Sequence, residues 1–110
     1  MGYVVNRAHH AEVGGKKPGS MPADAQTLEE EGVIIHPTYV VRKGKPQWST
    51  VEKLFKGALY PSRSPDENLA DLNGGLAALM LGASGLELLC SEHSSRQVVR
   101  YMRAIRSHTL

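Results

Sequence analysis

The feature that most constrains this chain is a run of apolar side chains between Leu69 and Cys90 that recur every three or four residues. This spacing places them on one face of an α-helix. The run follows Ser64, Pro65 and Glu67, and this order of a serine, a first-turn proline and an acidic residue predicts the helix start. The face consists of Leu69, Leu72, Leu76, Leu79, Ala83, Leu86 and Cys90. Glycines within the run are unfavourable in a helix interior, so we expect a kink or a division there.

Two further serine-led patterns predict helix starts at Ser49 and at Ser94, which gives about three helices after Trp48. Before Trp48, β-branched residues at 32–35 and 38–41 predict an edge strand with a bend at His36-Pro37. Residues 2–5 resemble the end of a strand, and residues 43–46 predict a turn.

Taken together, these elements predict an α+β fold in two parts. A loop-rich part with short strands covers residues 1–47, and a helical part covers residues 48–110. The glycine- and proline-rich stretch from residue 6 to residue 25 is unusually long for a structureless connection. Such loops are often functional, so we expect a site within it.

The composition excludes several classes of protein. The chain of 110 residues has a net charge of +2, and its C-terminal arginines lie on one helical face, which is typical of a solvated surface and not of nucleic-acid binding. Its one cysteine cannot form an internal disulfide. The apolar run from Leu76 to Leu81 falls far short of the roughly 20 residues that cross a bilayer. We therefore expect a cytoplasmic protein that binds neither nucleic acid nor membrane.

The densest group of reactive side chains is His9, His10 and Glu12, at the start of the long loop. Neutral imidazole is a common ligand of transition metals, and an adjacent pair can offer one nitrogen to a metal and another to substrate. Neighbouring residues on an extended chain point to opposite faces, so the two histidines are not expected to bind one ion together. Loop histidines with no ligand role remain the alternative.

Several segments resemble, in order, motifs of the hydantoinase B/oxoprolinase family. They are Asn6-Arg7-Ala8-His9-His10-Ala11-Glu12-Val13-Gly14-Gly15, Pro18-Gly19-Ser20-Met21-Pro22, Glu29-Glu30-Glu31-Gly32-Val33, Tyr60-Pro61-Ser62-Arg63, Asn68-Leu69-Ala70-Asp71-Leu72 and Tyr101-Met102-Arg103. The resemblance covers nearly the whole chain. Glu12 stands where the family usually has aspartate, and Ala8 where it usually has glycine.

The resemblance implies a hydrolase that opens cyclic amides such as 5-oxoproline and hydantoins at the expense of ATP. It implies an ATP-binding partner subunit or domain of the hydantoinase A type, and a divalent metal ion of the manganese or zinc kind. In metal-bearing relatives a residue that matches His9 is a ligand, with companions in an upstream His-x-x-Asp segment that this chain does not contain. With His9 as the ligand that the resemblance implies, His10 and Glu12 are the catalytic candidates, which either face the substrate or support the metal ligand.

One histidine falls short of the three protein ligands that a catalytic divalent site generally needs. We therefore expect the chain to be a fragment of a larger enzyme and inactive alone, and to require the missing parts of its own fold. The alternative is a non-catalytic helical binding module retained from the family, in which the apolar helical face covers a partner.

Overall fold

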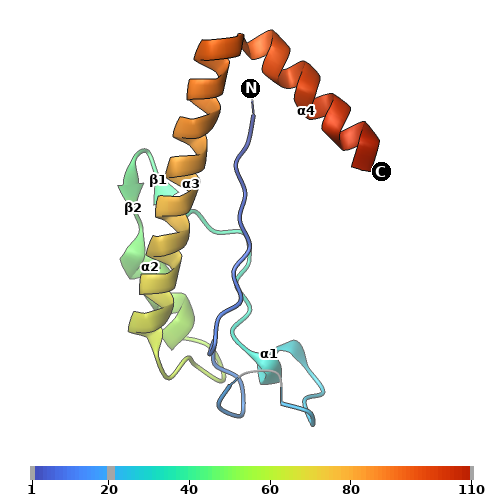
Figure 1. Cartoon of the computed structure of the whole chain (residues 1–110). Helices are drawn as coiled ribbons and strands as arrows, with labels where there is room; N and C mark the ends of the chain where they lie inside the picture. The colour runs from blue at the N-terminus through green and yellow to red at the C-terminus, as the bar shows by residue number, and fades with distance from the viewer. Residues whose placement is uncertain (1, 20–21, 110) are drawn as a thin grey trace. The chain divides into compact units, whose positions relative to one another are not determined.

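The computed structural model describes residues 2–19 and 22–109, and the chain divides into two compact units. The first, which we call the loop unit, is Ala8–Gly74. The second, the helical unit, consists of the residues up to Arg7 together with those from Gly75 onward. The predicted α+β class is confirmed, since the structure contains a two-stranded sheet and helices (Figure 1).

The loop unit contains a short helix α1 (Leu28–Glu31), a hairpin and a helix α2 (Trp48–Lys56). In the hairpin, β1 (Val41–Arg42) pairs antiparallel with β2 (Lys45–Pro46). Lys43 and Gly44 connect them with φ angles of 51° and 74°. Two positive φ values are the mark of the type I′ turn, whose twist matches that of a hairpin. The turn predicted at residues 43–46 is therefore confirmed at Lys43 and Gly44, whereas Lys45 and Pro46 form β2.

The strands predicted at residues 2–5 and 32–35 are wrong, because both segments are irregular. The run at 38–41 contributes only Val41 to a strand. A β-branched run forms a strand only where a second backbone completes the ladder. Val33 instead donates a single backbone hydrogen bond of 2.7 Å to the carbonyl of Val13, while Gly32 donates to Leu28 at the end of α1.

Three helix starts were predicted, and two are confirmed. Helix α3 (Pro65–His93) begins directly after Ser64, and α4 (Ser95–Thr109) begins directly after Ser94. The start predicted at Ser49 is wrong, since α2 begins at Trp48 and its cap is Gln47, without a side-chain hydrogen bond. The core of the loop unit includes two residues of α2, Val51 and Phe55, which are 3% and 2% exposed.

Helix α3 is continuous, so the kink or division expected at its glycines is absent (Figure 1). Within the helical unit, one of these glycines, Gly82, lies close against the extended N-terminal segment. A Cβ atom on Gly82 would lie 2.7 Å from the side chain of Val4. The amide of Asn6 donates a 2.9 Å hydrogen bond to the carbonyl of Gly75. The close approach of Val4 explains the glycine at position 82, whereas a Cβ on Gly85 would meet nothing within 4 Å.

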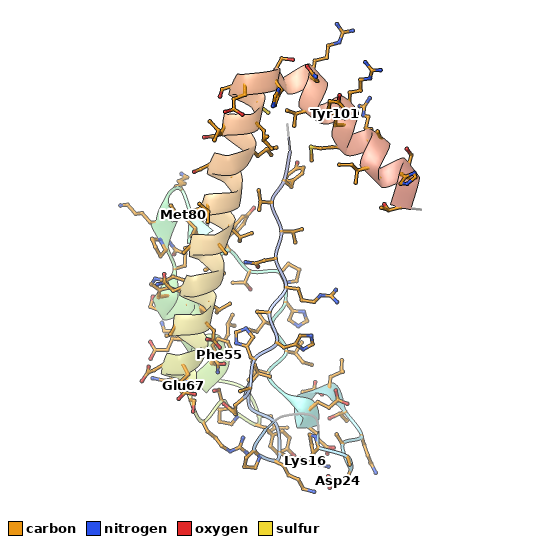
Figure 2. The ribbon with its side chains drawn as sticks, in the orientation of Figure 1. Lys16, Asp24, Phe55, Glu67, Met80 and Tyr101 are labelled. Atoms are coloured by element: carbon orange, nitrogen blue, oxygen red, sulfur yellow. The ribbon has the colours of Figure 1, made fainter. Side chains whose placement is uncertain are left out.

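The predicted apolar face of α3 borders a groove of about 560 Å³ in the helical unit. Leu79, Leu86 and Cys90 of α3 line it together with Val98 and Met102 of α4. Val98 is buried, and Cys90 is half-buried as expected of a small apolar residue. Many other apolar side chains stay exposed, including Met80 at 64% and Tyr101 at 62% (Figure 2).

By length and composition, α3 is the one helix of the described residues that could cross a membrane. This finding differs from the expectation based on the short run from Leu76 to Leu81. A core helix of a soluble protein passes the same test, so one such helix is weak evidence for a membrane span.

Candidate functional site

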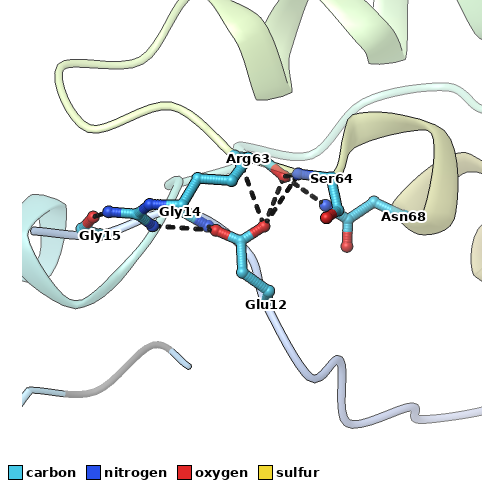
Figure 3. Close-up of polar contacts among 7 residues, drawn as sticks. Glu12, Gly14, Gly15, Arg63, Ser64 and Asn68 are labelled. Atoms are coloured by element: carbon cyan, nitrogen blue, oxygen red, sulfur yellow. Dashed lines mark hydrogen bonds and ion pairs between the residues drawn. The ribbon is translucent and has the colours of Figure 1, made fainter. Parts of the chain in front are cut away.

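The carboxylate of Glu12 is the centre of a hydrogen-bond cluster in the loop unit (Figure 3). It accepts hydrogen bonds from the backbone N–H of Gly14 at 2.6 Å and from the hydroxyl of Ser62 at 2.7 Å. Arg63 donates to it from its backbone N–H at 3.1 Å and from its guanidinium at 3.2 Å. The carboxylate therefore joins the long loop to the segment that precedes α3.

Two further residues complete this cluster. Asn68, 2% exposed on the first turns of α3, donates a 2.7 Å hydrogen bond to the hydroxyl oxygen of Ser62, which is itself 8% exposed. The guanidinium of Arg63 also donates to the carbonyl of Gly15 at 3.0 Å. Buried polar groups that satisfy one another in this way fix a single local geometry. We call the set of Glu12, Ser62, Arg63 and Asn68 the Glu12 cluster.

The two glycines after Glu12 allow the backbone to enter this cluster. Gly14 and Gly15 have φ angles of 84° and 92°, which residues other than glycine rarely adopt. A Cβ on Gly14 would lie 2.3 Å from the carbonyl oxygen of Tyr60, and one on Gly15 would lie 2.6 Å from that of Glu31. The glycine pair thus fits between two other backbone segments, both of which belong to the motifs recognised in the sequence.

The electrostatics of Glu12 favour its charged form. Burial alone would raise the pKa of its carboxyl group, but hydrogen bonds from Ser62, Gly14, Arg63 and Ser64 outweigh the burial and hold the pKa below the ordinary value of 4.5. At neutral pH the carboxylate is ionised and fully engaged with donors. The catalytic role predicted for Glu12 stays a prediction, and its observed contacts are those of a residue that organises the site.

His10 lies beside a second carboxylate, that of Asp71 on α3. The Nδ1 atom of His10 is 3.2 Å from Oδ2 of Asp71. The His10 side chain is 17% exposed, whereas its Nδ1 atom is buried and makes no hydrogen bond to any of the residues that the structure describes. The structure therefore pairs His10 with a residue for which no role had been predicted.

His9, the predicted metal ligand, is exposed. Within residues 2–19 and 22–109, no three side chains of His, Cys, Asp or Glu converge in a way that could hold a metal ion. A catalytic divalent site generally has three protein ligands and an open position. The described residues do not provide such a set, and His9 could supply one ligand only.

The signature segment of residues 29–33 lies beside the glycine pair. The backbone N–H of Lys16 donates to the carbonyl of Glu30 at 2.9 Å, and the ammonium group of Lys16 lies 3.0 Å from the Glu30 carboxylate. Lys16 also reaches Asp24, whose pKa is lowered to about 2, chiefly by a hydrogen bond from Lys17 (Figure 2). This network closes the long loop, although Ser20 and Met21 of its predicted motif lie outside the described residues.

Sequence reasoning had not placed Ser62, Arg63, Asn68 or Asp71 in the site. All four fall within segments recognised as motifs, so the signal was present in the sequence. Their residue types alone gave no indication of which loop they would contact. Only the fold brings residues so distant along the chain to Glu12 and His10.

Comparison with known proteins identifies the same family that these motifs resemble. The sequence model described as hydantoinase B/oxoprolinase matches residues 1–109. The chain belongs to the hydantoinase B/oxoprolinase family.

Among its relatives, a 5-oxoprolinase of Saccharomyces cerevisiae is 37% identical over 112 residues, which cover 96% of this chain and 9% of the yeast protein. The 5-oxoprolinase 1 of Arabidopsis thaliana is 35% identical, with 94% of this chain and 9% of the plant protein covered. A 5-oxoprolinase of Dictyostelium discoideum is 33% identical over 96% of this chain and 8% of its own length. The chain thus spans about a tenth or less of these relatives. No solved structure matches it significantly.

Proposed function

We propose that this chain forms part of the site of an ATP-dependent hydrolase that opens cyclic amides such as 5-oxoproline or hydantoins. One observation carries the proposal: segments 12–16, 30–33 and 60–64 of the family signature contact one another in the loop unit. Three relatives that match nearly the whole chain are named 5-oxoprolinases. Ring opening adds water across the amide and breaks its C–N bond, which leaves a carboxylate and an amine from 5-oxoproline, or a carboxylate and a carbamoyl N–H group from a hydantoin. ATP is hydrolysed to ADP and phosphate in the same overall reaction.

The residues of the chain have distinct proposed roles in this reaction. His10 faces the substrate, because its imidazole is held beside Asp71 yet stays partly accessible. The Glu12 cluster holds the loop that carries His10 and thereby reduces the freedom of the catalytic group before substrate binds. Fixed geometry of this kind supports a large share of enzymatic rate enhancement.

ATP and metal belong to the larger assembly in this proposal. ATP would be bound by a hydantoinase A-like subunit or domain, and a divalent ion of the manganese or zinc kind would be bound with His9 as one ligand. The described residues do not include a complete set of ligands for this ion, so its other ligands would come from the rest of the assembly. The chain alone is then expected to be inactive.

The exposed apolar residues of the helical unit support a need for further polypeptide. Leu81, Leu88 and Ile105 are 75%, 59% and 64% exposed. Apolar surface of this extent usually marks an interaction site. We propose that the remainder of a larger enzyme covers it. A non-catalytic binding module would expose a similar surface, and the two are distinguished by activity.

The proposed function is tested in a chimera. This chain replaces the matching segment of the yeast 5-oxoprolinase, and ATP-dependent hydrolysis of 5-oxoproline is measured. We expect hydrolysis by the chimera, and a loss of about 100-fold or more in His10→Ala, as for removal of a general acid or base. His36→Ala, outside the signature, is the matched control and should retain activity. A well-folded chimera in which His10→Ala and His36→Ala are equally active would refute the catalytic assignment.

The isolated chain supplies the complementary measurement. Incubated with ATP and either 5-oxoproline or hydantoin, it should release no product above a control without protein. Turnover that disappears in His9→Ala would show that the chain is a complete enzyme and would overturn the proposal that it needs a larger assembly.

A further inference from the structure

The contact between His10 and Asp71 bears on which nitrogen of the histidine carries the proton. In neutral histidine one ring nitrogen is a donor and the other an acceptor. If Nδ1 were the acceptor, the partial negative charge of its lone pair would lie 3.2 Å from the negatively charged oxygen of Asp71, which is repulsive. If Nδ1 carries the proton, the same contact becomes attractive. Electrostatic attraction between an Nδ1–H group and the Asp71 carboxylate at this distance favours the second arrangement.

The Glu12 cluster holds both members of this pair in place. Asp71 follows Asn68 by three residues on α3, so the two lie on the same side of the helix. Asn68 is tied to Ser62, and Ser62 to Glu12, which follows His10 by two residues. The cluster therefore fixes the helix that bears Asp71 and the loop that bears His10 within one hydrogen-bonded unit.

We propose that Asp71 is a positioning residue that holds His10 in the neutral tautomer with the proton on Nδ1. The Nε2 atom then presents a free lone pair. The part of the imidazole that remains accessible does not include Nδ1, which is buried. Nε2 is the atom that can accept a hydrogen bond from water or from the ring N–H of a cyclic amide. This use of the lone pair rests on the proposed function, whereas the tautomer itself rests on the contact with Asp71.

The tautomer is measured directly by ¹⁵N NMR of the imidazole nitrogens in the full chain. The measurement is made at about pH 8.5, at which free histidine in water is neutral. The variant His10→Gln identifies the His10 signals among those of the other histidines. In the unmodified chain we expect a protonated Nδ1 and an unprotonated Nε2. A His10 that carries its proton mainly on Nε2 would overturn the proposal.

Substitutions show whether Asp71 is responsible. Asp71→Ala should convert His10 to a population protonated mainly on Nε2, the form that free histidine prefers in water. Glu67→Ala, one turn earlier on the same helix, is the matched control and should leave the tautomer unchanged. If Asp71→Ala does not fold, Asp71→Asn preserves the size of the side chain and should weaken the preference, since an amide oxygen is an uncharged acceptor. An unchanged tautomer in a folded Asp71 variant would refute the proposal.

Because hydrolysis is not the readout, failure of the proposed hydrolase function leaves this result unaffected. Conversely, a chimera that hydrolyses 5-oxoproline while His10 has its proton on Nε2 would retain the proposed function and eliminate the role of Asp71.

Discussion

At the scale of single residues, close backbone approach and buried hydrogen bonds decide what each signature position can tolerate. Gly14 and Gly19 have the same φ angle of 84°, but they differ in their surroundings. A Cβ on Gly14 would meet the carbonyl of Tyr60 at 2.3 Å, whereas one on Gly19 would meet nothing within 4 Å. Substitutions at the two positions therefore distinguish the cost of a left-handed backbone from the cost of a steric collision.

We expect Gly14→Ala to destabilise the chain far more than Gly19→Ala. The change at Gly19 adds only the cost of a left-handed alanine, about 1 kcal/mol, while Gly14→Ala adds this cost and a collision with backbone that cannot move aside as a side chain could. Urea denaturation followed by circular dichroism measures the difference. Equal losses of stability in the two variants would show that Gly14 has more space than the structure gives it.

The lowered pKa of Glu12 predicts an acid-sensitive contribution to stability. A carboxyl whose folded pKa lies below its unfolded value of about 4.5 stabilises the fold above that pH, and loses this contribution as the pH falls through the lower, folded pKa. Glu12→Gln should reduce the free energy of unfolding at pH 7 by about 1–3 kcal/mol, because donors from Ser62 and Arg63 lose a charged acceptor.

The difference between Glu12→Gln and the unmodified chain should then shrink as the pH falls below 4.5. Asp24 and Glu30 also have lowered pKa values, but both variants retain them, so the comparison isolates Glu12. A difference in the free energy of unfolding that stays constant from neutral to strongly acidic pH would show that Glu12 does not have a lowered pKa in the folded chain.

At the scale of elements, helix α3 is held along its half-buried face. Leu79 lines the groove of the helical unit with Val4 and Val98, whereas Leu81, two residues along the same helix, is 75% exposed. The predicted apolar face is therefore a contact surface within the chain, while residues outside it contribute little to the fold of the chain.

Leu79→Asp should lower the stability of the helical unit by about 2 kcal/mol or more, because it places an unpaired charge in an apolar groove. Leu81→Asp, the matched control, should change stability by no more than about 0.5 kcal/mol. Thermal melts recorded by circular dichroism compare the two. If both melts match that of the unmodified chain, the groove does not stabilise the helix.

At the scale of the whole molecule, the described residues provide one part of a metal site at most. His9 is exposed and no set of three ligands converges among residues 2–19 and 22–109. Affinity for a divalent ion depends on the number of ligands and on the groups that orient them. A chain with a single imidazole in position binds such an ion far more weakly than a complete site.

The chain should therefore purify without stoichiometric metal, as measured by elemental analysis. Titration calorimetry with Zn²⁺ should give weak binding that His9→Ala reduces and His36→Ala leaves unchanged. Tight one-to-one binding that survives His9→Ala would locate the metal elsewhere and refute the proposed ligand.

The sequence by itself determined the starts of α3 and α4, the apolar face of α3 and the turn at Lys43 and Gly44, because periodicity and capping are local properties. It also determined the family, through motifs in a fixed order. Strands at 2–5 and 32–35 could not be decided locally, because a strand depends on a partner backbone. The tertiary structure alone decided that Glu12 binds Ser62 and Arg63, and that His10 lies beside Asp71. Contacts between residues so far apart arise only when the backbone between them has folded, and no local pattern encodes them.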